Sequence, residues 1–297
     1  MHQKARRKLV ARYRVTNGHD FHLKDFDPAD TDGFPGDKAD AEALLRDSTT
    51  RLAALQDKLY AQDRWAVLAI FQAMDAAGKD GAIKHVFSGL NPQGCTVEAF
   101  KAPSATELDH DFLWRHVLAL PRRGHIGIHN RSWYEEVLVA RLHPEILARQ
   151  KLPPALAGKR IWDERLEDIA AFERYLSRQG IILLKFFLHV GKDEQKARFL
   201  SRIEAPQKNW KFSADDVAER QHWKAYRHAY EQAIRATATE QAPWHVVPAN
   251  HKWFTRLVVS ETITAAMEDL NLRYPRVDAA EHHRLMEART ALLHEDD

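Results

Sequence analysis

The sequence predicts an α/β fold, in which a mainly parallel sheet of five strands lies between layers of helices. Short apolar runs alternate with helical patterns along the chain, and this order favours parallel strands joined by helical crossovers. The runs are largely continuous rather than alternating, which is typical of strands that are buried on both faces. With 297 residues, of which 44% are hydrophobic, the chain can build one large domain or two small ones.

The five predicted strands are the apolar runs, rich in Ala, Val, Leu, Ile and aromatic residues. The run at 181–189 is the most apolar, and Pro248 ends the last one. The predicted strands are residues 65–72, 96–100, 126–129, 181–189 and 244–247.

Helical patterns precede and separate these strands. In residues 40–60 leucines recur at helical spacing, which predicts an amphipathic helix that packs on an apolar surface. The other predicted helices are residues 81–89, 106–118, 162–178, 192–204, 214–237 and 253–272.

Both ends of the chain differ from this alternating middle. Residues 1–36 are basic and then rich in Asp, Gly and Pro, so we expect an extended arm with little regular structure. Residues 37–275 carry all the strands and form the predicted domain. Residues 276–297 predict a charged helix, either a docking element or a solvated end.

Composition narrows the classes of partner and location. The 44 Lys and Arg nearly cancel the 42 Asp and Glu, so the net charge of +2 gives no reason to expect a nucleic-acid partner. The single cysteine, Cys95, excludes an internal disulfide and suits a cytoplasmic location. The N-terminus lacks the apolar stretch of a signal peptide, and the longest apolar runs are too short to span a bilayer.

The first strand runs into a turn that resembles a phosphate-binding loop. The P-loop pattern is Gly, four residues, then Gly-Lys-Ser/Thr, between a strand and a helix. Gly78 and Lys79 match it, whereas Ala73 replaces the first glycine and Asp80 replaces the hydroxyl residue that usually holds magnesium.

Despite these two departures from the P-loop pattern, the turn has the physical features that bind phosphate. The N–H groups at the start of the following helix carry the positive end of its dipole, and Lys79 can neutralise a transferred phosphoryl group. Asp75 and Asp80 can hold magnesium or accept a proton, and Lys84 extends the positive surface toward a long polyanion. The alternative is an ordinary strand-to-helix turn with a chance Gly-Lys pair.

A second polar cluster follows the third predicted strand, where ligands of open parallel sheets bind. Arg131 can clamp phosphate oxygens with two parallel hydrogen bonds, and Glu135 and Glu136 can orient metal-bound waters or contact a nucleotide. Asn130 stands where an acidic residue is usual. The alternative is a capped helix start, in which acidic residues are favoured in the first turn.

A basic segment at 202–211 joins two predicted helices. Kinases often close a loop that bears Arg or Lys over the phosphates, and Arg202, Lys208 and Lys211 suit that role. The alternative is a solvated connection. Other basic residues, such as Arg141, are individually more typical of surface than of ligand binding.

Four motifs in this order resemble the polyphosphate kinase 2 family, and the resemblance covers about residues 10–275. They are Met-Asp-Ala-Ala-Gly-Lys-Asp-Gly from residue 74, Asn-Arg-Ser-Trp-Tyr-Glu-Glu from 130, Lys-Asn-Trp-Lys-Phe from 208, and Ala-Pro-Trp-His-Val-Val-Pro-Ala-Asn-His-Lys-Trp-Phe from 242. The family itself uses Asp-x-x-Gly-Lys-Asp, so the departures from the P-loop pattern are expected in it.

The resemblance implies a P-loop kinase-like core, similar to thymidylate kinase, with a helical lid at about 202–222. It implies phosphoryl transfer between inorganic polyphosphate and the nucleotides AMP, ADP and ATP, with Mg²⁺ or substituting Mn²⁺, in a homodimer or homotetramer. The expected catalytic residues are Asp75, which also binds metal, Lys79 and Arg131. The expected phosphate-binding residues are Ala76, Ala77, Gly78, Asp80, Gly81, Lys84 and Arg141. The expected nucleotide-binding residues are Asn130, Glu135 and Glu136, and the expected lid residues are Arg202, Lys208 and Lys211.

The stretch after Tyr134 also bears on the acceptor. It is Glu-Glu-Val-Leu-Val, not the Asn-Arg-Ala-Gly-Val type of the nucleoside-diphosphate class, which favours an AMP-using or AMP-and-ADP-using class. A single kinase domain favours the latter. Two alternatives stay open: an ATP-dependent nucleotide kinase of the thymidylate-kinase-like fold, and a non-catalytic polyanion-binding protein.

Overall fold

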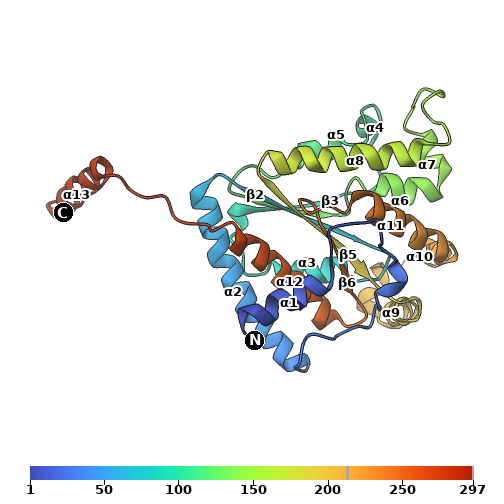
Figure 1. The fold of residues 1–297 in the computed structure, drawn as a ribbon, viewed down its shortest axis with the longest axis horizontal. Helices are drawn as coiled ribbons and strands as arrows, with labels where there is room; N and C mark the ends of the chain where they lie inside the picture. The colour runs from blue at the N-terminus through green and yellow to red at the C-terminus, as the bar shows by residue number, and fades with distance from the viewer. Residues whose placement is uncertain (212–213, 296–297) are drawn as a thin grey trace.

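A six-stranded sheet in the order β1-β6-β5-β2-β4-β3 forms the centre of the molecule (Figure 1). The computed structural model describes residues 1–211 and 214–295. The strands are β1 (Arg14–Val15), β2 (Ala66–Ala73), β3 (Cys95–Ala99), β4 (Ile126–Asn130), β5 (Ile181–His189) and β6 (Trp244–Pro248). The five predicted strands are confirmed. The sixth, β1, is a two-residue edge strand antiparallel to β6, too short to give a sequence pattern.

The five longer strands run parallel, so their carboxyl ends lie along one edge of the sheet. Every residue of β2 is buried, and β2 pairs with β5 along its whole length, from Ala66 opposite Ile181 to Ala73 opposite Leu188. Burial on both faces explains why these strands are continuous apolar runs.

Helices cover both faces of the sheet, which gives the predicted three layers (Figure 1). One layer contains α1 (Gln3–Arg12), α2 (Lys38–Gln62), α3 (Lys79–Val86) and α12 (Lys252–Asp269), packed on one another. The other contains α6 (Glu135–Leu142), α8 (Ile161–Arg178) and α11 (Trp223–Thr237). The helix α9 (Lys192–Glu204) follows β5 at the carboxyl edge.

Two predicted helices are interrupted. The expected helix at 106–118 becomes α4 (Ala105–Leu108) and α5 (Trp114–Leu118), because Asp111 starts a new turn by accepting the N–H of Leu113. The expected helix at 214–237 becomes α10 (Ala214–Glu219), η4 (Arg220–His222) and α11. The remaining short elements are η1 (Leu23–Asp25), η2 (Pro92–Gly94), α7 (Pro144–Ala148) and η3 (Pro206–Lys211).

The N-terminal stretch is more ordered than expected. It begins with α1 rather than an extended chain, because tertiary contacts stabilise a helix that has no side-chain cap of its own. Arg6 forms ion pairs with Asp47 of α2 and Glu261 of α12, and Leu9 is buried beneath the helix. Such long-range contacts override local propensity.

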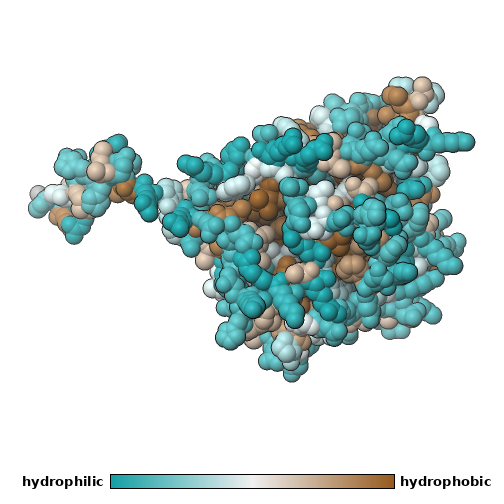
Figure 2. Space-filling view, viewed as in Figure 1, coloured by the Kyte–Doolittle hydropathy of each residue, from teal (hydrophilic) through white to brown (hydrophobic). Residues whose placement is uncertain are grey.

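The C-terminal α13 (Ala279–Leu293) confirms the predicted charged helix. It stands clear of the body, and its surface is mostly hydrophilic (Figures 1 and 2). All of its residues are exposed. In the described ranges, no helix combines the length and apolar character needed to cross a bilayer.

Candidate active site

The phosphate-type turn lies at the carboxyl end of β2. The chain leaves the strand after Ala73, passes through Ala76 in the left-handed region (φ 59°), and enters α3 at Lys79. Gly78 caps the helix with φ 105°, a conformation that favours glycine, and its carbonyl accepts the N–H of Ala82 at 2.9 Å. The first N–H groups of α3 have no earlier carbonyl within the helix, so the turn offers donors to an anion.

Lys79 folds back across this turn. Its Nζ donates to the carbonyl of Ala73 at 3.1 Å. Burial lowers the pKa of the Lys79 ammonium, and the nearby positive charge of Arg131 lowers it further. An anion bound in the turn would offset both effects, because it would stabilise the charged form of Lys79.

Arg198 of α9 supports the same turn through hydrogen bonds to its carbonyls. Its buried guanidinium donates to the carbonyls of Ala76 and Ala77 at 2.9 and 2.8 Å, and to those of Ala249 and Asn250 at 2.6 and 3.0 Å. One side chain therefore ties the turn after β2 to the loop after β6. Because Arg198 engages these carbonyls, the N–H groups of the turn are left to donate to an anion.

A second residue of α9 supports this arrangement. Gln195, three residues before Arg198 and hence on the same helix face, donates to the carbonyl of Asp75 at 2.8 Å. Its own Oε1 accepts from Arg220 of η4 at 2.6 Å. Two side chains of α9 thus hold three carbonyls in succession in the turn.

The end of β4 lies beside this turn. Arg131 adopts a left-handed backbone (φ 70°), and its N–H donates to the carbonyl of Phe71 in β2 at 3.0 Å. Its guanidinium is 3.9 Å from Asp75 and 3.9 Å from Glu135. Strained backbone of this kind persists where the surroundings fix it, as at functional sites.

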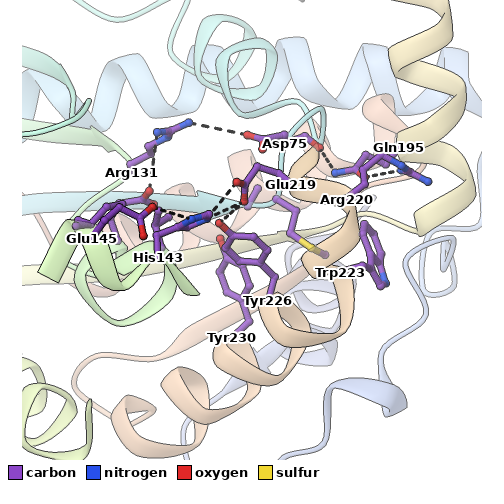
Figure 3. A pocket seen from close by; sticks show the side chains of 15 residues that line it. Asp75, Arg131, His143, Glu145, Gln195, Glu219, Arg220, Trp223, Tyr226 and Tyr230 are labelled. Atoms are coloured by element: carbon purple, nitrogen blue, oxygen red, sulfur yellow. Dashed lines mark hydrogen bonds and ion pairs between the residues drawn. The ribbon is translucent and has the colours of Figure 1, made fainter. Parts of the chain in front are cut away.

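Two cavities meet at Asp75 and Arg131, which line both. The first has a volume of about 370 Å³ and contains three aromatic side chains of α11, Trp223, Tyr226 and Tyr230 (Figure 3). Carboxylates also line it: Glu135, Glu145 and Glu219. Flat aromatic surfaces with hydrogen-bond acceptors suit a nucleobase and ribose.

The second cavity, of about 950 Å³, is larger and basic. The phosphate-type turn forms one side of it. Its cationic lining consists of Lys79, Lys101, Arg131, Arg198, Arg202, Lys252 and Arg256. This excess of positive charge suits a bound polyanion.

The predicted lid segment contributes to both cavities. Arg202 lines the second, whereas Glu219 and Arg220 line the first. Glu219 accepts from Tyr226 at 2.7 Å and lies 3.1 Å from Nε2 of His143, so it links the predicted lid segment to the junction of α6 and α7 (Figure 3).

Most of the predicted site residues come together. The turn residues predicted to bind phosphate, together with the three predicted catalytic residues, line the second cavity: Asp75, Ala76, Ala77, Gly78, Lys79, Asp80, Gly81 and Arg131. Asn130 also lines that cavity and donates to Asp80 at 2.8 Å, whereas Glu135 lines the first cavity. The side chains of Lys208 and Lys211 lie outside the described residues.

Three predicted residues lie elsewhere. Lys84 is exposed on α3, and neither it nor Arg141 lines either cavity. Glu136, predicted to contact the nucleotide, is buried 3.6 Å from both Arg115 and Arg165 and lines neither of the two cavities. The reason is geometric: successive residues of a helix point about 100° apart, so Glu135 and Glu136 cannot face the same cavity.

Other residues of the site were missed from the sequence. Arg198 and Gln195 lie in a helix with no motif around them. Trp223, Tyr226 and Tyr230 follow the spacing i, i+3, i+7, which places them on one face of a helix. That pattern is equally typical of a core-facing helix, so it identifies a face and not a binding site.

Asp75 and Asp80 suit a magnesium ion that takes its other ligands from water and substrate phosphates, rather than from a cage of protein side chains. Among the described residues there is no group of three or more His, Cys, Asp or Glu side chains that could hold a metal. Mg²⁺ commonly binds through one or two carboxylates, several waters and the phosphates of its substrate. The two carboxylates at the edge of the basic cavity fit that mode.

A parallel sheet whose first long strand ends in a Gly-Lys turn, with a basic cavity above it, defines a phosphotransferase of the P-loop kinase type. The family comparison makes this class specific. The chain belongs to the polyphosphate kinase 2 family, because the model described as Polyphosphate kinase 2 (PPK2) matches residues 36–275. The predicted family and fold are therefore confirmed, and the protein is a polyphosphate kinase.

Individual relatives agree with the family. The chain is 50% identical over 282 residues to an ADP-polyphosphate phosphotransferase of Rhodopseudomonas palustris, covering 95% of this chain and 97% of the relative. It is 43% identical over 278 residues to an AMP/ADP-polyphosphate phosphotransferase of Meiothermus ruber, covering 94% and 100%. The crystal structure of polyphosphate kinase 2 from Arthrobacter aurescens TC1 superposes with a TM-score of 0.85 at 41% identity, covering 94% of this chain and 96% of that one.

Proposed function

We propose that this polyphosphate kinase moves the terminal phosphoryl group of inorganic polyphosphate to AMP and to ADP, reversibly. The observation that carries the proposal is the pair of unlike cavities that meet at Asp75 and Arg131. The basic cavity suits the polyanionic donor, and the aromatic cavity suits the nucleotide. Both partners can then present their phosphates at the shared wall.

The transfer proceeds by in-line displacement. A terminal phosphate oxygen of the nucleotide attacks the terminal phosphorus of polyphosphate, and the bond from that phosphorus to its bridging oxygen breaks. The products are a nucleotide with one more phosphate and a polyphosphate with one fewer. Lys79 and Arg131 offset the charge that develops on the phosphoryl oxygens, so catalysis consists mainly of positioning and electrostatic stabilisation.

The proposed metal is Mg²⁺, with Mn²⁺ as a substitute. Asp75 would hold it, with Asp80 beside the same turn, and when bound the ion supplies charge neutralisation between phosphates. Arg131, 3.9 Å from Asp75, holds that carboxylate toward the junction of the two cavities.

The relatives and the position of Glu135 support the proposed acceptor class. The two relatives are named for ADP and for AMP/ADP, and Glu135 projects into the aromatic cavity. We propose that both AMP and ADP are used. We also propose a cytoplasmic homodimer or homotetramer; the lone Cys95 suits a reducing compartment.

A polyphosphate-driven assay tests the function. The purified chain is supplied with polyphosphate, Mg²⁺ and AMP, ADP, GMP or GDP, without ATP, and the products are separated by chromatography. We expect ADP and ATP from AMP, and ATP from ADP. No product without added ATP would instead indicate an ATP-dependent nucleotide kinase. Polyphosphate binding without turnover would indicate a non-catalytic polyanion-binding protein.

A further inference from the structure

A buried ion pair joins the central sheet to the helix layer that carries the aromatic cavity. Lys185, in the middle of β5, is fully buried, and its ammonium group pairs with Glu173 of α8, which is only 1% exposed. Neither residue lines the two cavities that meet at Asp75 and Arg131. Moving two charges from water into the core costs free energy, and replacing such a pair by apolar side chains is often neutral or stabilising. Stability alone therefore does not explain why the core contains this pair.

Hydrogen bonds use the polar groups of the pair fully. Besides Glu173, the Lys185 ammonium donates to the hydroxyl of Tyr134 at 3.1 Å and to the carbonyl of Thr237 at 2.8 Å. The other carboxylate oxygen of Glu173 accepts from the Tyr134 hydroxyl at 2.7 Å and from the indole N–H of Trp133 at 3.2 Å. Burial raises the pKa of the Glu173 carboxyl and lowers the pKa of the Lys185 ammonium, and the opposite charge counters both effects. A buried network whose polar groups are satisfied specifies one arrangement of its members.

Two members of this network lie in the segment between Arg131 and Glu135. Trp133 and Tyr134 are both fully buried, and Tyr134 directly precedes the first residue of α6. Arg131 has a left-handed backbone, and its guanidinium is 3.9 Å from the Glu135 carboxylate. Because the network fixes the rings of Trp133 and Tyr134, it also holds the short segment from which Arg131 and Glu135 project into the cavities.

A third member connects the network to α11, the helix that carries the aromatic side chains of the first cavity. Thr237 is the last residue of α11 and follows Tyr230 by seven positions, which places both on one face of the helix. Its hydroxyl lies 2.8 Å from that of Tyr134. Two residues after Lys185 and on the same face of β5, Phe187 stacks on Tyr230 with ring centroids 4.2 Å apart. The network and this stack therefore hold α11 against β5.

We propose that Lys185 and Glu173 are positioning residues for phosphoryl transfer, a role that rests on the proposed function. Their ion pair acts through Trp133 and Tyr134, and it fixes the backbone from which Arg131 reaches the junction of the two cavities. A displacement of about 1 Å at such a group can cost about a hundredfold in rate. Polyphosphate is bound mainly by the turn after β2 and by cations of α9 and α12. Loss of the pair therefore lowers kcat and leaves KM for polyphosphate nearly unchanged.

The variant Lys185→Met/Glu173→Gln tests this role by removing both charges. Methionine is similar in length to lysine, and the amide oxygen of glutamine can still accept from Trp133 and Tyr134. Because no unpaired charge stays in the core, the urea midpoint should remain close to that of the wild type. In steady-state assays with AMP and polyphosphate, we expect kcat to fall by about tenfold or more and KM for polyphosphate to change by less than about twofold.

The matched control removes an ion pair from the opposite helix layer. Arg6 of α1 and Glu261 of α12 pair at 3.0 Å, with 14% and 2% of their side chains exposed. Arg6→Met/Glu261→Gln should keep kcat within about twofold of the wild type, whatever its effect on the urea midpoint. If the Lys185–Glu173 pair served stability alone, the two double variants would behave alike, with an unchanged kcat per folded molecule.

A double-mutant cycle tests whether the pair acts through Arg131. In an Arg131→Ala background, Lys185→Met/Glu173→Gln should lower kcat by less than about twofold, because the side chain that the pair positions is already absent. Equal factors in the two backgrounds would overturn the proposal, as would an unchanged kcat when Arg131 is present.

Tyr134→Phe gives a second test that keeps both charges. It removes the hydroxyl that accepts from Lys185 and donates to Glu173, while the ring stays in place. We expect kcat to fall by about threefold or more, and an unchanged kcat would overturn the proposal even if the double variant failed to fold. The wild type in the same assay separates the two proposals. No turnover in the wild type would overturn the proposed function and the positioning role together, whereas wild-type turnover with equal kcat in the variants would overturn the positioning role alone.

Discussion

At the residue scale, two lysines of α3 separate a binding role from a surface role. Lys79 starts the helix, lines the basic cavity and donates to the carbonyl of Ala73, whereas Lys84 is exposed and lines neither cavity. Lys79→Ala should lower kcat for polyphosphate-driven transfer by about a hundredfold or more, since it removes a preorganised positive charge. Steady-state rates with AMP and polyphosphate measure this.

The same substitution one turn further along the helix is the control. Lys84→Ala should keep near-normal rates, and the circular dichroism of both variants should match that of the wild type. Asp75→Asn should also abolish transfer while folding persists. Near-normal rates in both Lys79→Ala and Asp75→Asn would contradict the assigned site.

The sequence can reveal the site residues that are neighbours in the chain, because only these form a motif. The turn from Asp75 to Gly81 and the cluster from Asn130 to Glu135 are short stretches, so their chemistry is visible as a motif. Arg198 acts through four carbonyls brought together by the fold, and no local pattern marks such a residue. Glu136 lies in a motif but outside both cavities, because a position in a motif does not determine which way a helical side chain points.

At the element scale, Arg198 couples α9 to two loops of the sheet edge. Arg198→Met should lower the free energy of unfolding by about 2–4 kcal/mol, because four buried carbonyls lose a charged donor. It should also raise KM for polyphosphate, since the turn loses its support. Urea denaturation and steady-state kinetics measure the two effects.

Two further variants isolate the cause. Arg198→Lys keeps the charge but has no planar fork to span four carbonyls, so it should recover only part of the stability. Lys196→Met removes an exposed charge of the same helix and should change stability by less than about 0.5 kcal/mol. Equal losses of stability in Lys196→Met and Arg198→Met would contradict the stabilising role of the hydrogen bonds from Arg198 to the four carbonyls.

Unlike α9, the helix α13 makes no buried contacts with the rest of the described chain. All of its residues are exposed, and it stands clear of the body (Figures 1 and 2). Deleting residues 276–297 should therefore leave the free energy of unfolding within about 0.5 kcal/mol of the wild type and transfer rates unchanged. A large loss in either quantity would show that α13 contacts a part of the enzyme that the single chain does not reveal.

At the scale of the whole molecule, burial explains which parts of the fold were predictable. The strands β2 and β5 are buried on both faces, so their apolar runs are unmistakable, and alternation with helices predicts their parallel order. By contrast, α1 and β1 depend on contacts with α12 and β6, more than 200 residues away. No local pattern contains that information.

The fold also buries four histidines in the core of the protein. His116, His129, His189 and His245 are nearly inaccessible, and desolvation lowers the pKa of each, to about 4 for His129 and for His189. Both ring nitrogens of His116 lack a hydrogen-bond partner within the described residues. In the unfolded chain the same rings titrate near pH 6.5.

This difference predicts that the protein loses stability in mild acid. Below pH 6.5 the unfolded chain binds protons that the folded core does not, so the free energy of unfolding falls with pH until the folded rings also titrate, near pH 4 for His129. Each ring costs about 1.4 kcal/mol one unit below its ordinary pKa, so four should cost on the order of 5 kcal/mol between pH 7.5 and 5.5. Urea denaturation at the two pH values measures the loss. His116→Phe should reduce it by about one quarter, because Phe keeps the contact with Phe100 and binds no proton. His282→Phe, on the exposed α13, should leave the loss unchanged, and an equal pH dependence in all three proteins would exclude His116 as a cause.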